Sequence, residues 1–170
     1  MGVVVFIVLS CYISIYNTFK KLENKIQESY SSIDVYLSKR YNAVMNCLNV
    51  CKGYAKHEKE VLESVIELRN SNIKEISNTN NEIDKVNKGI IALSESYPDI
   101  KADKVFIELQ NVIFECERHL AAARRFYNSN VSLLNQKVDS FPNNLVANMH
   151  KIEKKEYFKV SAEERNNVVI

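Results

Sequence analysis

The first nineteen residues carry no charged side chain, whereas charged residues begin at Lys20 and recur through the rest of the chain. At about 1.5 Å of rise per residue, nineteen helical residues span roughly 28 Å, close to the ~30 Å hydrocarbon core of a bilayer. We therefore expect residues 1–19 to form a transmembrane anchor, residues 20–158 a folded domain, and residues 159–170 a C-terminal tail.

Two alternatives for the N-terminus fit less well than an anchor. A cleaved signal peptide needs a basic region before its apolar core and small residues at the cleavage site. Nothing basic precedes Val3, and residues 17–19 are Asn, Thr and Phe. A buried core helix of a soluble protein is more often interrupted by polar residues.

Lysines predict the orientation of this anchor. Lys20, Lys21 and Lys25 flank its C-terminal end, and only the amino terminus flanks the other end. Because positive residues stay on the cytoplasmic side, we expect a single-pass protein of the cell membrane, with its N-terminus outside and its domain in the cytoplasm.

Composition favours an all-helical domain without a nucleic-acid partner. Three glycines and two prolines in 170 residues leave little room for hairpin turns. The net charge of +2 arises from 23 basic and 21 acidic residues that are interspersed, so no basic stripe for nucleic acid is visible.

One apolar stripe runs from the anchor deep into the domain. Its members recur at spacings of three and four residues, which places them on one face of a helix. No helix breaker precedes Gly53, so we predict one continuous helix from the membrane to about Lys52. The stripe consists of Ile15, Phe19, Leu22, Ile26, Tyr30, Ile33, Leu37, Tyr41, Val44, Leu48 and Cys51.

A second helix is predicted from about Lys56 to Ser94, and it is less regular. Apolar residues keep the helical period, but Arg69, Asn80 and Asn87 interrupt it. Residues 70–81 are rich in poor helix formers, so the helix is either weak there or split by a loop, and we favour a continuous helix.

A third helix follows a turn over residues 94–100, where Pro98 disfavours the helical conformation of Tyr97. Its stripe ends at Pro142, and residues 143–150 form a predicted short fourth helix. We therefore predict an all-α fold, a long antiparallel three- to four-helix bundle whose first helix is continuous with the anchor. The third stripe consists of Phe106, Leu109, Ile113, Cys116, Leu120, Ala123, Tyr127, Val131, Leu134, Val138 and Phe141.

An ordered set of short motifs resembles the LemA family, which comprises bacterial proteins with one N-terminal membrane helix and a helical-bundle domain. The resemblance covers essentially the whole chain and implies the same fold and location, but little about mechanism. The motifs are Tyr16-Asn17, Ile33-Asp-Val35, Leu37, Arg40-Tyr41, Asn46, Lys52-Gly-Tyr-Ala-Lys-His-Glu58, Tyr97-Pro98, Phe106, Arg124-Arg-Phe-Tyr-Asn128 and Phe141-Pro-Asn-Asn144.

The sequence departs from the family pattern at two places. Met45 stands where the family usually has Pro, so a kink in the first helix is not expected. Lys151 and Ile152 replace a Gly-Phe pair, which leaves open whether the tail docks on the bundle.

No catalytic or metal-binding pattern is complete. His57-Glu58 resembles half of a zinc-protease motif, but Val61 occupies the position of the second histidine. Cys47 and Cys51 could join His57 around a metal, although cysteines on a helical stripe are more often core residues. His119 has no partnered nucleophile, and its spacing from Glu115 is typical of a surface ion pair. We expect no enzyme activity, no cofactor, no metal and no small-molecule substrate.

Polar residues beside the two clean stripes are the candidate site residues. In one interpretation, a carboxylate–guanidinium pair and tyrosine hydroxyls fix the register between helices. In the other, Arg40, Arg125 and Tyr36 form an exposed patch for a protein partner. The candidates are Asp34, Arg40, Tyr41, Arg124, Arg125, Tyr127 and Asn128.

These observations favour a non-enzymatic, membrane-anchored scaffold or adaptor with protein partners. Self-association is part of this hypothesis, because Val35, Val50 and Val112 flank the core stripes. A regulatory subunit of a membrane enzyme, such as a protease or a sensor system, is the alternative. A hydrolase ranks third, and a deep pocket around His119 would favour it.

Overall fold

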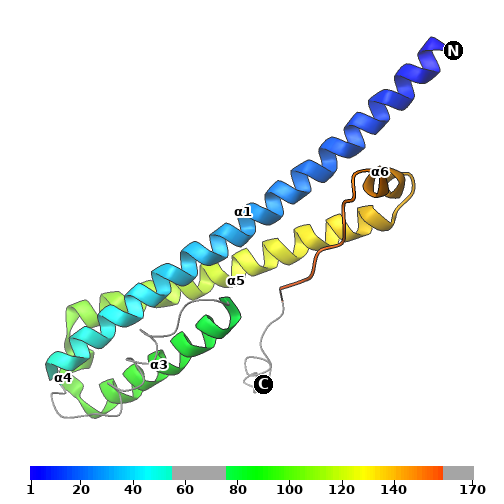
Figure 1. The fold of residues 1–170 in the computed structure, drawn as a ribbon. Coiled ribbons are helices and arrows are strands. Elements are labelled where there is room, and N and C mark those ends of the chain that lie inside the picture. The colour runs from blue at the N-terminus through cyan, green and yellow to red at the C-terminus, as the bar shows by residue number, and fades with distance from the viewer. Residues whose placement is uncertain (55–75, 159–170) are drawn as a thin grey trace, which may run out of the picture. The chain divides into compact units, whose positions relative to one another are not determined.

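The computed structural model describes residues 1–54 and 76–158, and every regular element in these residues is a helix (Figure 1). The predicted all-α fold is therefore confirmed. The first part of the predicted second helix, including His57, lies outside the described residues. The elements are α1 (Gly2–Tyr54), α3 (Ile76–Ser96), α4 (Pro98–Ala102), α5 (Lys104–Asp139) and α6 (Asn143–Met149).

The predicted continuity of the first helix is confirmed. α1 is a single helix of 53 residues that begins in the uncharged segment and passes Met45 without interruption. It contains an 18-residue window of mean hydropathy 1.9 of which only 6% is buried, so it is long and apolar enough to cross a membrane. α1 is the one helix among the described residues with these properties.

The described chain divides into two compact units, and α1 and α5 contribute to both. The first unit contains residues 1–33 and 122–158, and the second contains residues 34–54 and 76–121. Each unit has its own buried side chains and is described separately below.

The core of the first unit joins α1, α5, α6 and the segment after α6. Leu134 and Val131 of α5 are fully buried against Phe19 of α1. Burying each large apolar side chain contributes about 1.5–3 kcal/mol. Ala147 and Ile152 belong to the same cluster and hold α6 and the following segment to the long helices. The cluster comprises Phe19, Leu22, Ile26, Val131, Leu134, Ala147 and Ile152.

The second unit buries the continuation of the same two stripes together with one face of α3. Most of the predicted stripe positions on α1 and α5 are buried here, Tyr41 and Leu109 are half-buried, and α3 contributes Ile83 and Ile90. Its core includes Leu37, Val44, Leu48, Cys51, Ile83, Ile90, Ile100, Phe106, Ile113, Cys116 and Leu120.

Two stripe positions are exposed, so the prediction that they are core residues was wrong. Phe141 is 79% exposed because α5 ends at Asp139, so the helical phase no longer directs its side chain inward. Tyr30 is 42% exposed, and its ring lies 6.3 Å from that of Tyr127 at the edge of the core.

Within the turn predicted over residues 94–100, only Tyr97 is non-helical, because α3 extends to Ser96 and the short helix α4 begins at Pro98. Tyr97 is extended, as expected before Pro98. Asp103 then caps α5, since its carboxylate accepts hydrogen bonds from the backbone N–H groups of Val105 and Phe106. The Tyr54 hydroxyl donates to the same carboxylate, and these hydrogen bonds lower the pKa of Asp103.

Candidate functional site

Arg40 is the most deeply buried charged residue among those the structure describes, with 3% of its surface exposed. Its guanidinium joins three helices of the second unit. It donates to Asn80 Oδ1 on α3 at 2.8 Å and to Glu117 Oε1 on α5 at 2.6 Å. It also forms an ion pair with Asp84 on α3. We call Arg40, Asn80, Asp84 and Glu117 the arginine cluster.

Helical phase explains why these residues meet. Arg40 lies three residues after Leu37 and four before Val44, so it projects toward the core with the apolar stripe. Asn80 lies three residues before Ile83, and Glu117 lies four after Ile113. Each polar residue therefore occupies a core phase on its own helix, and that spacing is the sequence signal that could have identified the cluster.

Charge and burial in the cluster fit a structural role. One guanidinium faces two carboxylates, whose side chains are 30% and 43% exposed for Asp84 and Glu117. Water therefore solvates part of the excess negative charge, while Arg40 and Asn80 are enclosed. An arginine fork bound to three partners on two other helices fixes their register, because a one-residue slip separates every pair.

The acidic partners of Arg40 are Asp84 and Glu117, whereas the predicted candidate Asp34 is exposed. Tyr41, a member of the α1 stripe, is half-buried. The alternative patch of Arg40, Arg125 and Tyr36 cannot include Arg40, because its burial keeps it from a partner. Tyr36 is half-buried and stacks on His119, with ring centroids 4.6 Å apart.

The other predicted polar residues lie in the first unit, where Arg124, Tyr127 and Asn128 contact the segment after α6. Asn128 donates to the carbonyl of Phe158 at 3.1 Å and accepts from its N–H at 2.7 Å. Asn135 makes the same two bonds with Lys155, both at 2.9 Å. We call Asn128 and Asn135 the asparagine clamp.

The spacing of the clamp matches an extended chain. The separation of seven residues from Asn128 to Asn135 corresponds to a rise of about 10 Å in a helix. The separation of three residues from Lys155 to Phe158 spans about the same distance in an extended chain. The segment therefore runs antiparallel to α5. Each asparagine side chain makes the pair of backbone hydrogen bonds that a neighbouring strand would otherwise make. Whether this part of the chain docks is thus resolved, whereas residues 159–170 lie outside the described part.

Arg124 and Tyr127 support the same segment. The guanidinium of Arg124 lies 5.1 Å from the centre of the Phe158 ring, and the Tyr127 hydroxyl donates to the carbonyl of Glu156 at 3.3 Å. Burial raises the pKa of Tyr127 above its ordinary value, so its hydroxyl remains a donor. Arg125, next to Arg124, is exposed.

At the start of the segment, Lys151 adopts a left-handed conformation with φ of 53°. Glycine is the residue that tolerates this region without a steric cost. Ile152 is buried in the core of the first unit, so it is an apolar anchor for the start of the segment.

The described residues that were considered for catalysis or metal binding lie either in a packed core or in contact with an oppositely charged side chain. Cys47 and Cys51 are buried in the second unit, where burial raises the pKa of Cys47 to about 11. Glu117 contacts Arg40, and His119 lies exposed, 3.8 Å from Glu115. Over residues 1–54 and 76–158, no three His, Cys, Asp or Glu side chains converge as a metal site.

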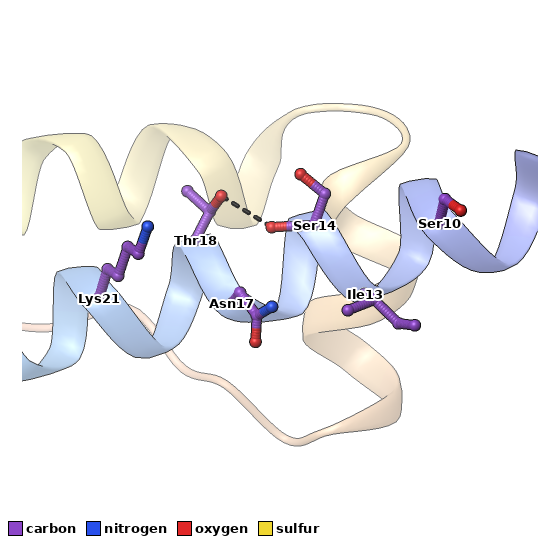
Figure 2. A pocket seen from close by; sticks show the side chains of 6 residues that line it. All are labelled: Ser10, Ile13, Ser14, Asn17, Thr18 and Lys21. Carbon is purple, nitrogen blue, oxygen red and sulfur yellow. Dashed lines mark hydrogen bonds between the residues drawn. The ribbon is translucent and has the colours of Figure 1, made fainter.

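A surface pocket in the first unit lies along α1 and is lined by residues of this helix alone (Figure 2). Thr18 donates to the Ser14 carbonyl within it. Binding sites for small molecules usually gather polar groups from several elements around an enclosed cavity. This pocket instead lies on the surface of one helix, at the C-terminal end of the predicted anchor. Its lining residues are Ser10, Ile13, Ser14, Asn17, Thr18 and Lys21.

Comparison with known proteins places this architecture in a family. The model of the LemA family matches residues 29–170, which is most of the chain. This protein belongs to the LemA family. It is also similar to Protein LemA of Metamycoplasma hominis, with 27% identity over 164 residues that cover 92% of this chain and 74% of that protein. The resemblance identified from short motifs is thereby confirmed.

Proposed function

We propose that this LemA family protein is a non-enzymatic scaffold or adaptor, anchored in a bacterial membrane by residues 1–19, with its helical units in the cytoplasm. The observation that carries the proposal is α1 itself. One helix joins an exposed apolar segment to the packed units, so the bundle is tied to the bilayer without a flexible linker. Such a support suits a protein that positions partners beside a membrane.

The charges around the anchor support the cytoplasmic orientation. Lys20 and Lys21 are exposed at the point where the apolar segment ends, and Lys20 pairs with Glu23 at 2.8 Å. Lys25 follows one turn later and is also exposed. Lysines in this position favour retention on the cytoplasmic side.

A surface for a protein partner is available on α5 in the first unit. Phe126 is 66% exposed and Leu133 is 45% exposed, and their spacing of seven residues places them on one side of the helix. Arg125 is exposed beside them. Arginine and large aromatic side chains are the usual energetic anchors of protein interfaces, so we propose these three residues as the docking patch.

The experiment is in-cell crosslinking of the tagged full-length chain, followed by detergent purification and identification of crosslinked proteins. The docking patch predicts one recurrent partner that is lost in Arg125→Ala. Arg118→Ala is the matched control, because it removes an exposed arginine of the same helix that pairs only locally with Glu115 at 2.6 Å. Circular dichroism of both variants confirms that helicity is retained.

Other outcomes reject parts of the proposal. Crosslinked ladders that contain only this chain would reject the adaptor and favour a self-assembling structure. Val35 and Val112 have exposed apolar side chains that could take part in such contacts. Release of the protein from membranes by alkaline carbonate would reject the anchor. Digestion of the helical units by protease added outside intact cells would reject the cytoplasmic orientation.

A further inference from the structure

α6 has two apolar faces, and one of them is exposed. Val146 and Ala147 are buried in the first unit. On the opposite side, Leu145 is 58% exposed and Met149 is 70% exposed. Phe141, in the turn before α6, is 79% exposed. We call Phe141, Leu145 and Met149 the apolar corner.

The apolar corner lies beside the uncharged segment of α1. The Tyr12 hydroxyl and Nε2 of His150 are 2.6 Å apart and hydrogen-bonded, and the Tyr16 ring lies 4.5 Å from the His150 ring. The Tyr12 hydroxyl also lies 3.5 Å from Sδ of Met149. In Figure 1, α6 is accordingly next to the N-terminal part of α1.

This position sets the depth of the corner. Phe19 is the last residue of the uncharged N-terminal segment. Tyr16 and Tyr12 precede it by three and seven positions, which corresponds to roughly 5–10 Å along the helix axis. Interfacial amphipathic helices bury their apolar faces by about 5–10 Å at the boundary between headgroups and acyl chains. The exposed apolar side chains therefore lie at the depth where lipid replaces water.

The polar groups around the corner fit the same boundary. Tyr12 and Tyr16 are half-buried amphipathic rings, the residue type enriched at membrane interfaces. Lys21, five residues after Tyr16, and Lys151, next to His150, are exposed and carry charges that attract anionic headgroups. The apolar side chains thus have charged and aromatic neighbours of the kinds that flank a bilayer core.

We propose that the apolar corner is a second membrane contact, in which Phe141, Leu145 and Met149 enter the interface of the bilayer that α1 crosses. The proposal rests on the membrane anchor of the proposed function. Two contact points on one unit restrict the tilt of that unit relative to the membrane plane. The occupant of this surface is lipid, because α1 continues from the same region into the membrane.

The test uses the full-length protein in nanodiscs of phosphatidylcholine and phosphatidylglycerol. A Cys11→Ser background removes the exposed cysteine, and the described remaining cysteines are buried. Single probes of the environment-sensitive dye NBD are placed by Leu145→Cys, Met149→Cys, Phe6→Cys or Leu133→Cys. Phe6 reports the anchor, and Leu133 is an exposed residue of α5 in the same unit that lies outside the apolar corner.

The result expected is several-fold stronger quenching at Leu145 and Met149 than at Leu133 by lipids with a nitroxide near the headgroup. Quenching at Phe6 but not at Leu145 or Met149 would overturn the second contact and leave the anchor intact. Absence of quenching at Phe6 would instead show that the anchor proposal has failed. A blue-shifted Leu145 probe that lipid nitroxides do not quench, and that depends on two chains per disc, would assign the corner to a second copy.

Discussion

The arginine cluster predicts how much the free energy of unfolding falls when Arg40 is replaced. Arg40→Ala removes a guanidinium that is 3% exposed and that donates to a buried amide and to two carboxylates. A hydrogen bond between a charged group and a buried partner contributes about 1.5–3 kcal/mol. The carboxylates of Asp84 and Glu117 stay partly solvated, so each ion pair contributes only about 0.5–1 kcal/mol.

Together these terms predict that Arg40→Ala lowers the free energy of unfolding by about 3 kcal/mol. The value lies at the lower end of the range for disrupting a fully buried pair, about 3–5 kcal/mol, because water reaches both acids. Arg40→Lys retains the charge but not the planar fork, so we expect an intermediate loss. Arg40→Met retains most of the volume, and its difference from Arg40→Ala measures the cavity left by the side chain.

The assay is equilibrium urea unfolding of the full-length protein in a mild detergent, followed by circular dichroism at 222 nm. Arg125→Ala is the control, and a change within about 0.5 kcal/mol is expected there because Arg125 is exposed. The double variant Arg40→Ala with Asp84→Asn should lose less than the sum of the single losses, since both remove the same ion pair. Equal, small effects of Arg40→Ala and Arg125→Ala would refute the argument that the cluster fixes helix register.

Two further predictions concern the other polar contacts. The double variant Asn128→Ala with Asn135→Ala should exchange the amide hydrogens of Lys155 and Phe158 faster, because it loses the side chains that accept hydrogen bonds from these N–H groups. The control variant Gln136→Ala should leave this exchange unchanged. Unchanged exchange in the double variant would contradict the clamp. Burial raises the pKa of the Cys47 thiol from 9.0 to about 11, so its contribution to stability is complete below pH 9 and is lost as the pH rises toward 11. The urea midpoint should therefore fall less over this interval in Cys47→Ala than in the unmodified protein, and an equal fall in both would contradict it.

Local periodicity accounts for what was predictable in the fold. Apolar residues at spacings of three and four residues require no knowledge of partner helices, so the stripes of α1 and α5 identified most of the core. Pro98 and Pro142 act on their immediate neighbours, and the helix boundaries near them followed. Phe141 was misassigned because the same periodicity was extended past the end of α5.

The candidate site was only partly predictable because its contacts are non-local. Arg40 was identifiable as a polar residue beside an apolar stripe, but Asp84 and Glu117 are 44 and 77 residues away. Their pairing depends on the register of α3 and α5, which a pattern within one helix does not contain. Asn128 was identified, although its role in holding the segment after α6 became visible only from the backbone of Phe158.

The sequence by itself determined that this protein is helical, that its first helix begins in an uncharged segment, and which faces are apolar. These properties follow from interactions within a few residues along the chain. Only the tertiary structure decided that Arg40 is enclosed by three helices, that Ile152 is buried, and that α6 lies beside Tyr12. These outcomes depend on side-chain shape and hydrogen-bond geometry between distant segments, which compete for the same buried volume and are settled only when the helices pack.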